Sequence, residues 1–358
     1  MTDVVIEELI LPGTADAPDA GDFVEMIGIR NRVETEVLGT DALNVTPRGI
    51  LPYFGNTPTR SRRHFVARLD GRIAGRAILG WPTATGAAEV SINVDVLPEH
   101  RGRGIGTTLL ETVESEAVAL GRDVMQCDQP HGRTPGGVRI PSPTGWGDLP
   151  ADDVGVRFAV RHSYQLEMVA RISQLDPRAA VESTGEHLRA SREHAGADYG
   201  LVTWTGATPD AWIGDMADLR SGMSTDAPRA GMEMAPDPWD AERVRAHAAR
   251  QLATGRILVT AAAEHVPSGR LVAFTEIEID TRPTPYAVQE DTLVLRSHRG
   301  HRLGLLLKAA NILHLLEVSP DANAITTFNA EDNRPMLDVN EALGFVPIGL
   351  EGNWQKRI

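Results

Sequence analysis

One segment of the sequence occurs twice, and this repeat constrains the fold more than any other feature. Residues 94–106 read VDVLPEHRGRGIG, and residues 292–304 read TLVLRSHRGHRLG, 198 residues later. Farther upstream, the glycine at position 71 is matched by Gly269 at the same separation of 198 residues. Two separate matches in one register indicate a duplicated structural unit.

The length of the chain agrees with two such units. A chain of 358 residues has room for two domains of ordinary size. The region between the units contains the dipeptide Asp176-Pro177, which breaks a strand, and then a stretch of charged residues that suits a solvated helix. We therefore expect an N-terminal domain at 1–176, a linker at 177–198 and a C-terminal domain at 199–358.

Composition and charge exclude several classes of function. The formal net charge is −14, with 49 acidic and 35 basic residues. Nucleic acids and anionic membranes bind basic surfaces, so this balance argues against both and leaves room for a cationic substrate. The single cysteine, Cys127, excludes an intrachain disulfide, and the first residues lack the pattern of a signal peptide. We expect a cytoplasmic protein, either a monomer or a homodimer, with no nucleic-acid or membrane partner.

Both units show the same predicted order of elements: helices, an antiparallel hairpin, then strand, helix, strand, helix and strand. Asp70-Gly71 joins two apolar runs and is a strong hairpin signal. Apolar residues recur at helical spacing in 109–120 and in 302–316. The order predicts an α+β fold of two tandem domains, each a mixed, mostly antiparallel twisted sheet flanked by helices. Residues 127–152, rich in proline and glycine, are predicted to form a long loop, either a lid or a surface insertion.

The repeated segment connects a predicted strand to a predicted helix through a glycine-rich turn. Glycines let the backbone approach a ligand closely, and the start of a helix presents unpaired N–H groups. Together they form an anion site suited to a pyrophosphate. The third glycine comes too early for the dinucleotide pattern GxGxxG, and no lysine follows as a Walker loop requires. What remains is the pattern RxxGxG, formed by Arg101, Gly104 and Gly106.

In this context the turn resembles the core of the GCN5-related N-acetyltransferases (GNAT). The closing segment, from Asn329 to Met336 and on to Leu343-Gly344-Phe345, resembles the same family. The resemblance covers 22–175 and 199–357, and the tandem pair is similar to mycothiol synthase-like actinobacterial members. It implies acetyl-CoA as the cofactor, with its pyrophosphate on the turn amides and its pantetheine arm along the preceding strand.

The resemblance also implies which residues bind this cofactor. In the second unit Arg302 replaces the glycine that matches Gly104. The residues carried over are Val94, Asp95, Val96, Arg101, Gly102, Arg103, Gly104, Ile105, Gly106 and Thr107 in the first unit, and Thr292, Leu293, Val294, Arg299, Gly300, His301, Arg302, Leu303, Gly304, Asn329 and Asn333 in the second.

The catalytic groups depart from the family pattern. Many members use a tyrosine acid four residues before the glycine of the Gly-Phe pair, and here that position holds Asn340 in the second unit and Ala159 in the first. A thiol with a pKa near 8.5 can leave without a strong acid, so the loss is tolerable. The candidates for a general base are the strand carboxylates Glu89, Glu290, Asp291 and Glu276, each of which could instead be a solvated surface group. The eleven histidines show no metal-ligand spacing, so no metal is expected.

Two functions from different classes therefore remain. The first is an acetyl-CoA-dependent N-acetyltransferase that acts on a small, cationic amine by direct attack on the thioester. In it, either unit could perform the chemistry: the first has the better phosphate turn, and the second has the better closing segment. We favour the second unit for the chemistry, with the first binding CoA. The second function is a non-catalytic acyl-CoA-binding or sensing protein, which the missing tyrosines and Arg302 favour.

Overall fold

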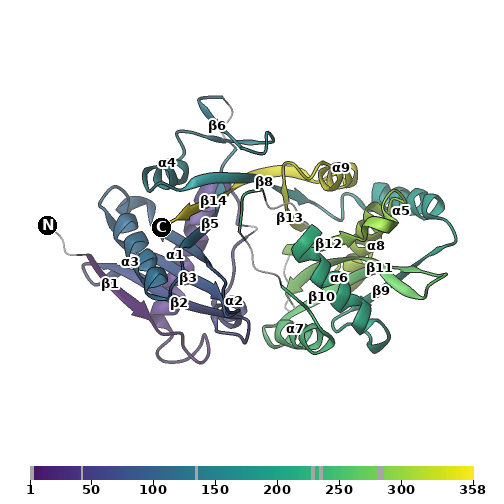
Figure 1. The fold of residues 1–358 in the computed structure, drawn as a ribbon, viewed down its shortest axis with the longest axis horizontal. Coiled ribbons are helices and arrows are strands. Elements are labelled where there is room, and N and C mark those ends of the chain that lie inside the picture. Colours follow the sequence, from purple (N-terminus) through teal and green to yellow (C-terminus); the bar gives the residue numbers. More distant parts are fainter. Residues whose placement is uncertain (1–3, 42, 134–135, 227–229, 234–236, 281–285) are drawn as a thin grey trace.

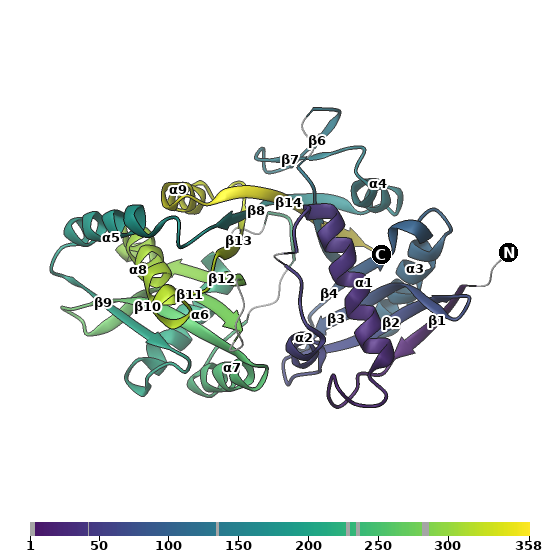
Figure 2. The same ribbon diagram turned by 180° about the vertical axis from the view of Figure 1, so that it is seen from behind.

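The structure is a computed structural model, and it describes residues 4–41, 43–133, 136–226, 230–233, 237–280 and 286–358. Two lobes lie side by side and share one continuous twelve-stranded sheet (Figures 1 and 2). The strand order is β1-β2-β3-β4-β5-β14-β8-β13-β12-β11-β10-β9. The α+β fold expected from the sequence is confirmed. Among the described residues, no helix is both long enough and apolar enough to cross a bilayer.

The N-lobe contains the first half of this sheet and the helices around it. Its core lies between the sheet and α3, where Leu109 and Val113 are fully buried. Its elements are β1 (Val4–Leu9), α1 (Gly21–Leu38), α2 (Pro47–Phe54), β2 (Arg60–Leu69), β3 (Arg72–Pro82), β4 (Glu89–Val96), α3 (Ile105–Ala119), β5 (Val124–His131), β6 (Arg139–Pro141), β7 (Asp148–Pro150) and α4 (Val154–Arg161).

The C-lobe repeats this plan. The apolar face predicted at 302–316 lies against the sheet, with Leu306, Ile312 and Leu315 buried. Its elements are α5 (Val181–Ala195), β9 (Tyr199–Thr205), α6 (Ile213–Asp226), α7 (Ala241–Ala253), β10 (Arg256–His265), β11 (Arg270–Asp280), β12 (Tyr286–Val294), α8 (Leu303–Val318), β13 (Ala324–Ala330) and α9 (Arg334–Leu343).

Each lobe contains one parallel strand pair that separates after a few residues. In the N-lobe, β4 pairs with β5 only over Glu89–Ser91. In the C-lobe, β12 pairs with β13 only over Tyr286–Val288. Beyond these residues the strands diverge toward the glycine turn, so an opening forms in the sheet in front of the turn.

The two remaining strands, β8 (Gln165–Leu175) and β14 (Val346–Arg357), join the lobes. They pair with each other at the centre of the sheet. β8 ends the N-terminal half of the sequence, yet it pairs with β13 of the C-lobe. β14 ends the chain, yet it pairs with β5 of the N-lobe. Each lobe is thus completed by a strand that the repeat assigns to the other, an arrangement visible along the top of Figure 1.

The structure of two connecting segments differs from what we expected. The stretch 127–152 is not one long loop, because β5 continues to His131 and β6 and β7 form a small antiparallel ribbon before α4; residues 134–135 lie outside the described residues. The charged helix expected between the units is α5, and its Leu188 and Ala195 pack against the C-lobe core. The segment expected to be a linker therefore contributes a helix to the C-lobe.

Candidate functional site

The N-lobe glycine turn has a backbone that requires glycine at two points. Gly102 and Gly104 have φ angles of 75° and 85°, in the left-handed region. The first backbone bond of α3 runs from Thr108 N to Gly104 O at 3.0 Å. The amides of the three residues before Thr108 therefore stand at the open end of the helix, where the helix dipole favours an anion.

This turn forms one wall of a groove of about 750 Å³. Of the predicted cofactor residues in the N-lobe, Arg103 alone is not part of the wall; its guanidinium lies 3.4 Å from the carbonyl oxygen of Glu99. Arg101 reaches the groove, but its guanidinium is paired with Glu36 of α1 at 2.6 Å. The predicted residues that line the groove are Val94, Asp95, Val96, Arg101, Gly102, Gly104, Ile105, Gly106 and Thr107.

The C-lobe turn has the same shape with a different sequence. Gly300 has a φ of 90°, and Arg302 precedes α8 with a φ of 55°. The first backbone bond of α8, from Leu306 N to Arg302 O, measures 3.0 Å. A Cβ added at Gly304 would lie 4.0 Å from Val339, so there is room above the helix start for a ligand.

A larger groove, of about 1080 Å³, extends from this turn. Among the predicted residues, His301 is not part of its wall; its ring lies 5.0 Å from that of Tyr199. The predicted residues that line the groove are Thr292, Leu293, Val294, Arg299, Gly300, Arg302, Leu303, Gly304, Asn329 and Asn333, together with the candidate bases Glu290 and Asp291.

A β-bulge brings these two candidate bases into the C-lobe groove. Thr275 pairs with Thr292, but Ile277 pairs with Gln289, so two residues of β12 lie opposite one residue of β11. A bulge of this kind turns side chains away from the regular alternation of a strand. The side chain of Glu290 is exposed to the open groove. The protein around its carboxyl and the neighbouring carboxylates raise its pKa to about 8.

The other two candidate bases lie elsewhere. Glu276 is buried behind the bulge, where its carboxylate accepts from Arg220 at 2.5 Å. The second guanidinium nitrogen of Arg220 lies 3.8 Å from Asp291. Burial raises the pKa of both carboxyls, and Arg220 opposes the shift. Glu89 begins β4 at the end of the strand away from the glycine turn, and the lining of neither N-lobe cavity includes it.

The structure adds groove residues that the sequence did not indicate. Glu351 and Asn353 reach the C-lobe groove from β14. Burial and the nearby Asp128 raise the pKa of Glu351 to about 8. Lys308 lies on the buried face of α8, with its Nζ 2.8 Å from Asn340 Oδ1, and burial lowers its pKa to about 7. In the sequence, the one indication of this buried groove residue was a lysine among the apolar positions of 302–316.

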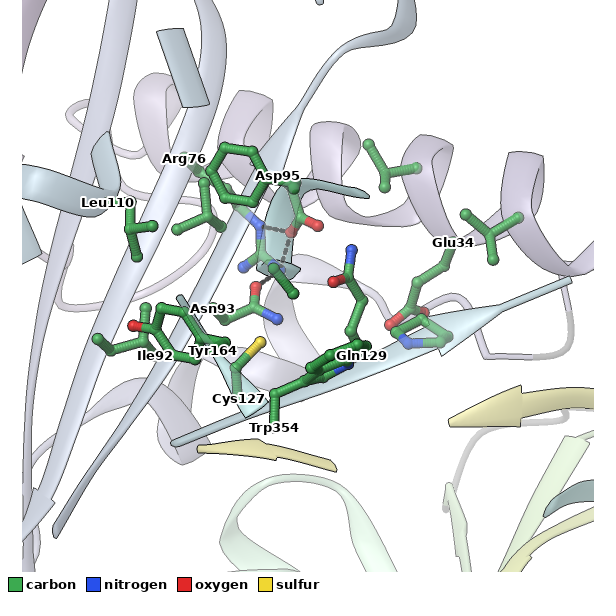
Figure 3. A pocket seen from close by; sticks show the side chains of 16 residues that line it. Glu34, Arg76, Ile92, Asn93, Asp95, Leu110, Cys127, Gln129, Tyr164 and Trp354 are labelled. Atoms are coloured by element: carbon green, nitrogen blue, oxygen red, sulfur yellow. Dashed lines mark hydrogen bonds and ion pairs between the residues drawn. The ribbon is translucent and has the colours of Figure 1, made fainter. Parts of the chain in front are cut away.

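The inner end of the N-lobe groove differs from the C-lobe groove, because its polar side chains are bonded to one another. Figure 3 shows a small cavity, of about 70 Å³, in which the side chain of Arg76 is directed toward Asp95 and Asn93. Arg76 is bonded to Asp95 at 2.6 Å and to Asn93 at 2.9 Å. The hydroxyl of Tyr164, which also borders this cavity, donates to Glu114 at 2.9 Å. Both Asp95 and Tyr164 therefore already have hydrogen-bond partners within the protein.

Comparison with known proteins agrees with this geometry. Residues 60–133, which cover β2 to β5 of the N-lobe, match the acetyltransferase (GNAT) domain family. A solved tandem GNAT protein from the clavulanic acid biosynthesis pathway matches 99% of this chain and 98% of its own, with a TM-score of 0.73 and 24% identity. Residues 60–133 thus match a GNAT domain, and the whole chain has the fold of a tandem GNAT protein.

Two further similarities describe its relatives. A GCN5-related N-acetyltransferase from Sphaerobacter thermophilus matches this protein over 99% of its chain and 95% of the other, with a TM-score of 0.62 and 11% identity, which shows a shared fold. The mycothiol acetyltransferase of Nocardiopsis dassonvillei is 39% identical over 89 residues. This last match spans 25% of each chain, about a quarter of that relative's length.

Proposed function

We propose that this protein transfers an acetyl group from acetyl-CoA to a small cationic amine, and that the chemistry takes place in the C-lobe groove. The observation that carries the proposal is the bulge in β12. It places Glu290 and Asp291 in a groove that also contains the glycine turn and Glu351. Membership of an acetyltransferase domain family supports the reaction class.

The residues of the groove fit the proposed cofactor. The amides at the start of α8 have no acceptor within the helix, and the space above Gly304 is open. We infer that the pyrophosphate of acetyl-CoA lies on these amides and that its arm follows Thr292–Val294 between the separated strands. Acetyl-CoA supplies the activated acyl group.

The carboxylates of the groove fit an amine. The ionised forms of Glu290, Asp291 and Glu351 give the groove a negative potential, which favours the cationic form of the amine on arrival. Because the pKa values of Glu290 and Glu351 are about 8, this potential strengthens as the pH rises toward 8. Only the neutral amine can attack a thioester. Glu290, whose pKa is raised to about 8, can accept the ammonium proton near neutral pH because its basicity is matched to that pH.

The N-lobe is proposed to bind CoA without chemistry. Its turn offers the same helix amides and a groove of about 750 Å³. At the inner end, Asp95 is already engaged in an ion pair with the buried Arg76. A second candidate function, a non-catalytic acyl-CoA sensor, is favoured by one observation: Asn340 occupies the position of the family's tyrosine acid and is bonded within the protein.

Calorimetry with acetyl-CoA tests the binding sites. Gly304→Trp places a large side chain in the open space over the α8 amides, and Gly106→Trp places one at the start of α3 against the groove-wall residues Phe158 and Val96; neither position has a positive φ. We expect two sites in the wild type and one in each variant. Absence of binding to the wild type would contradict both candidate functions.

Release of free thiol from acetyl-CoA with a panel of cationic amines then separates enzyme from sensor. We expect turnover with at least one amine, retained in Gly106→Trp and lost in Gly304→Trp. Tight binding without turnover on any amine favours the sensor. Turnover that survives in Gly304→Trp and disappears in Gly106→Trp would place the chemistry in the N-lobe.

A further inference from the structure

Three side chains of the C-lobe form a buried hydrogen-bonded chain that leads to the groove. Lys308 of α8 is 1% exposed, and its Nζ donates to Asn340 Oδ1 at 2.8 Å. Asn340 is 2% exposed, and its Nδ2 donates to Asn329 Oδ1 at 2.6 Å. Asn329 is partly exposed and lines the groove. Lys308 is itself part of the groove wall, and the chain connects its buried ammonium through Asn340 to the partly exposed Asn329.

The ammonium sets the direction of every bond in this chain. Below its pKa of about 7 the lysine is charged and has only donors, so it requires the oxygen of the Asn340 amide on its side. The nitrogen of Asn340 must then face Asn329, which requires the oxygen of Asn329 in return. Thr327 donates to that same oxygen at 3.3 Å. The NH₂ group of Asn329 is consequently directed away from both donors.

A lysine is an expensive residue for this position. In the part of the chain that the structure describes, no carboxylate forms an ion pair with Lys308, and its Nζ lies 5.7 Å from the centre of the Phe345 ring. An ammonium buried without a counter-ion costs free energy, whereas methionine would fill the same space without that cost. Its presence points to a role other than stability.

We propose that Lys308 is a positioning residue: through Asn340, it holds the Asn329 amide with its N–H groups toward the C-lobe groove, where they donate to an acceptor oxygen of the ligand. This inference rests on the proposed function, under which that oxygen is a carbonyl of the acyl-CoA arm. The oxygen and nitrogen of an amide are similar in size, so without the lysine either orientation of Asn329 would fit.

Two variants interrupt the chain in different ways. Lys308→Met removes the ammonium that fixes the direction. Asn340→Asp keeps an acceptor for Lys308 and nearly the same volume, but has no N–H for Asn329. Both are combined with Gly106→Trp, so that calorimetry with acetyl-CoA measures the C-lobe site alone. We expect each to raise the Kd about tenfold, the effect of losing one well-oriented hydrogen bond.

A matched control separates this role from a structural one. Asn311 is also buried on α8, and its Nδ2 donates to the Val259 carbonyl at 2.8 Å, but it does not border the groove. Asn311→Met is expected to lower the melting temperature and leave the Kd unchanged. Lys308→Met is expected to do the reverse, with weaker binding and a melting temperature at or above that of the wild type.

The outcomes distinguish this inference from the proposed function. Wild-type affinity in both Lys308→Met and Asn340→Asp overturns the inference. Absence of binding to the Gly106→Trp parent overturns the proposed site instead, and the side-chain amide NMR signals of Asn329 and Asn340 then decide the inference. We expect these signals to shift in Lys308→Met relative to the wild type, and coincident signals would overturn it.

Discussion

Arg302 and Gly104 occupy the same point of the two glycine turns, and both have left-handed backbones, with φ angles of 55° and 85°. A left-handed conformation costs a non-glycine residue about 1–2 kcal/mol, and glycine almost nothing. The C-lobe therefore retains the shape of the turn at an energetic cost that the N-lobe avoids. The backbone requirement, rather than the glycine itself, is what the two turns share.

Arg302→Gly is accordingly expected to raise the free energy of unfolding by about 1 kcal/mol, after allowance for the greater freedom of glycine in the unfolded chain. Urea unfolding measures this change. Arg302→Ala serves as the control, because it removes the guanidinium but keeps the strained φ. An equal gain in the alanine variant would show that the side chain, not the backbone, is the source of the cost.

The glycine turns could be predicted from the sequence because their signals are local. In each unit a strand, a turn and an apolar helix stand next to one another in the chain, with three glycines in the first turn and two in the second. The structure brings most of the predicted residues to the two grooves. The exchange of β8 and β14 could not be predicted, because the alternation of a strand is the same whichever neighbour it pairs with. For this reason Glu351 and Asn353 were not identified as groove residues. The bulge in β12 likewise depends on pairing with β11 rather than on any local motif.

Trp354 provides a test of the strand exchange. It lies four residues from the end of the chain, yet it is 1% exposed in the N-lobe core. Trp354→Ala is expected to lower the free energy of unfolding by about 3–5 kcal/mol, the range for loss of a buried aromatic side chain. Trp146→Ala, at a side chain that is 50% exposed, should change it by less than about 0.5 kcal/mol. A loss below 1 kcal/mol for Trp354 would argue that β14 does not complete the N-lobe.

Two tyrosines join the lobes through carboxylates, one buried and one at the surface. The hydroxyl of Tyr53 in α2 lies 2.9 Å from Oε2 of the buried Glu278. Tyr53→Phe is expected to cost about 1–3 kcal/mol of unfolding free energy, because a buried carboxylate loses a donor that water cannot replace. Tyr286 donates to Asp41 at 2.6 Å in an exposed position, so Tyr286→Phe should cost much less. Equal losses in thermal or urea unfolding would show that Glu278 is accessible to water.

The rate of acetyl transfer should depend on ionised Glu290. Because its pKa is raised to about 8, the fraction able to accept a proton increases as the pH rises toward that value. In wild type, kcat/KM for thiol release should therefore rise between pH 6 and about 8. Glu290→Gln should remove this rise and lower the rate about 100-fold, the lower end for loss of a general base. Glu89→Gln is the comparison, and if it alone abolished the rise, the base would lie in the N-lobe.

Glu351 should make the protein less stable as the pH rises. Its pKa is about 8 in the folded state against an ordinary 4.5, so it is protonated in both states below about 4.5. Between these two values the folded state binds more protons than the unfolded state, and the free energy of unfolding falls with increasing pH. The free energy of unfolding of Glu351→Gln should change less with pH than that of the wild type over this window, as measured by urea unfolding at pH 5, 6, 7 and 8. The exposed Glu182 of α5 supplies the control, because Glu182→Gln should show the same pH dependence as the wild type. If the curves of both variants ran parallel to the wild-type curve, burial of Glu351 between the lobes would be contradicted.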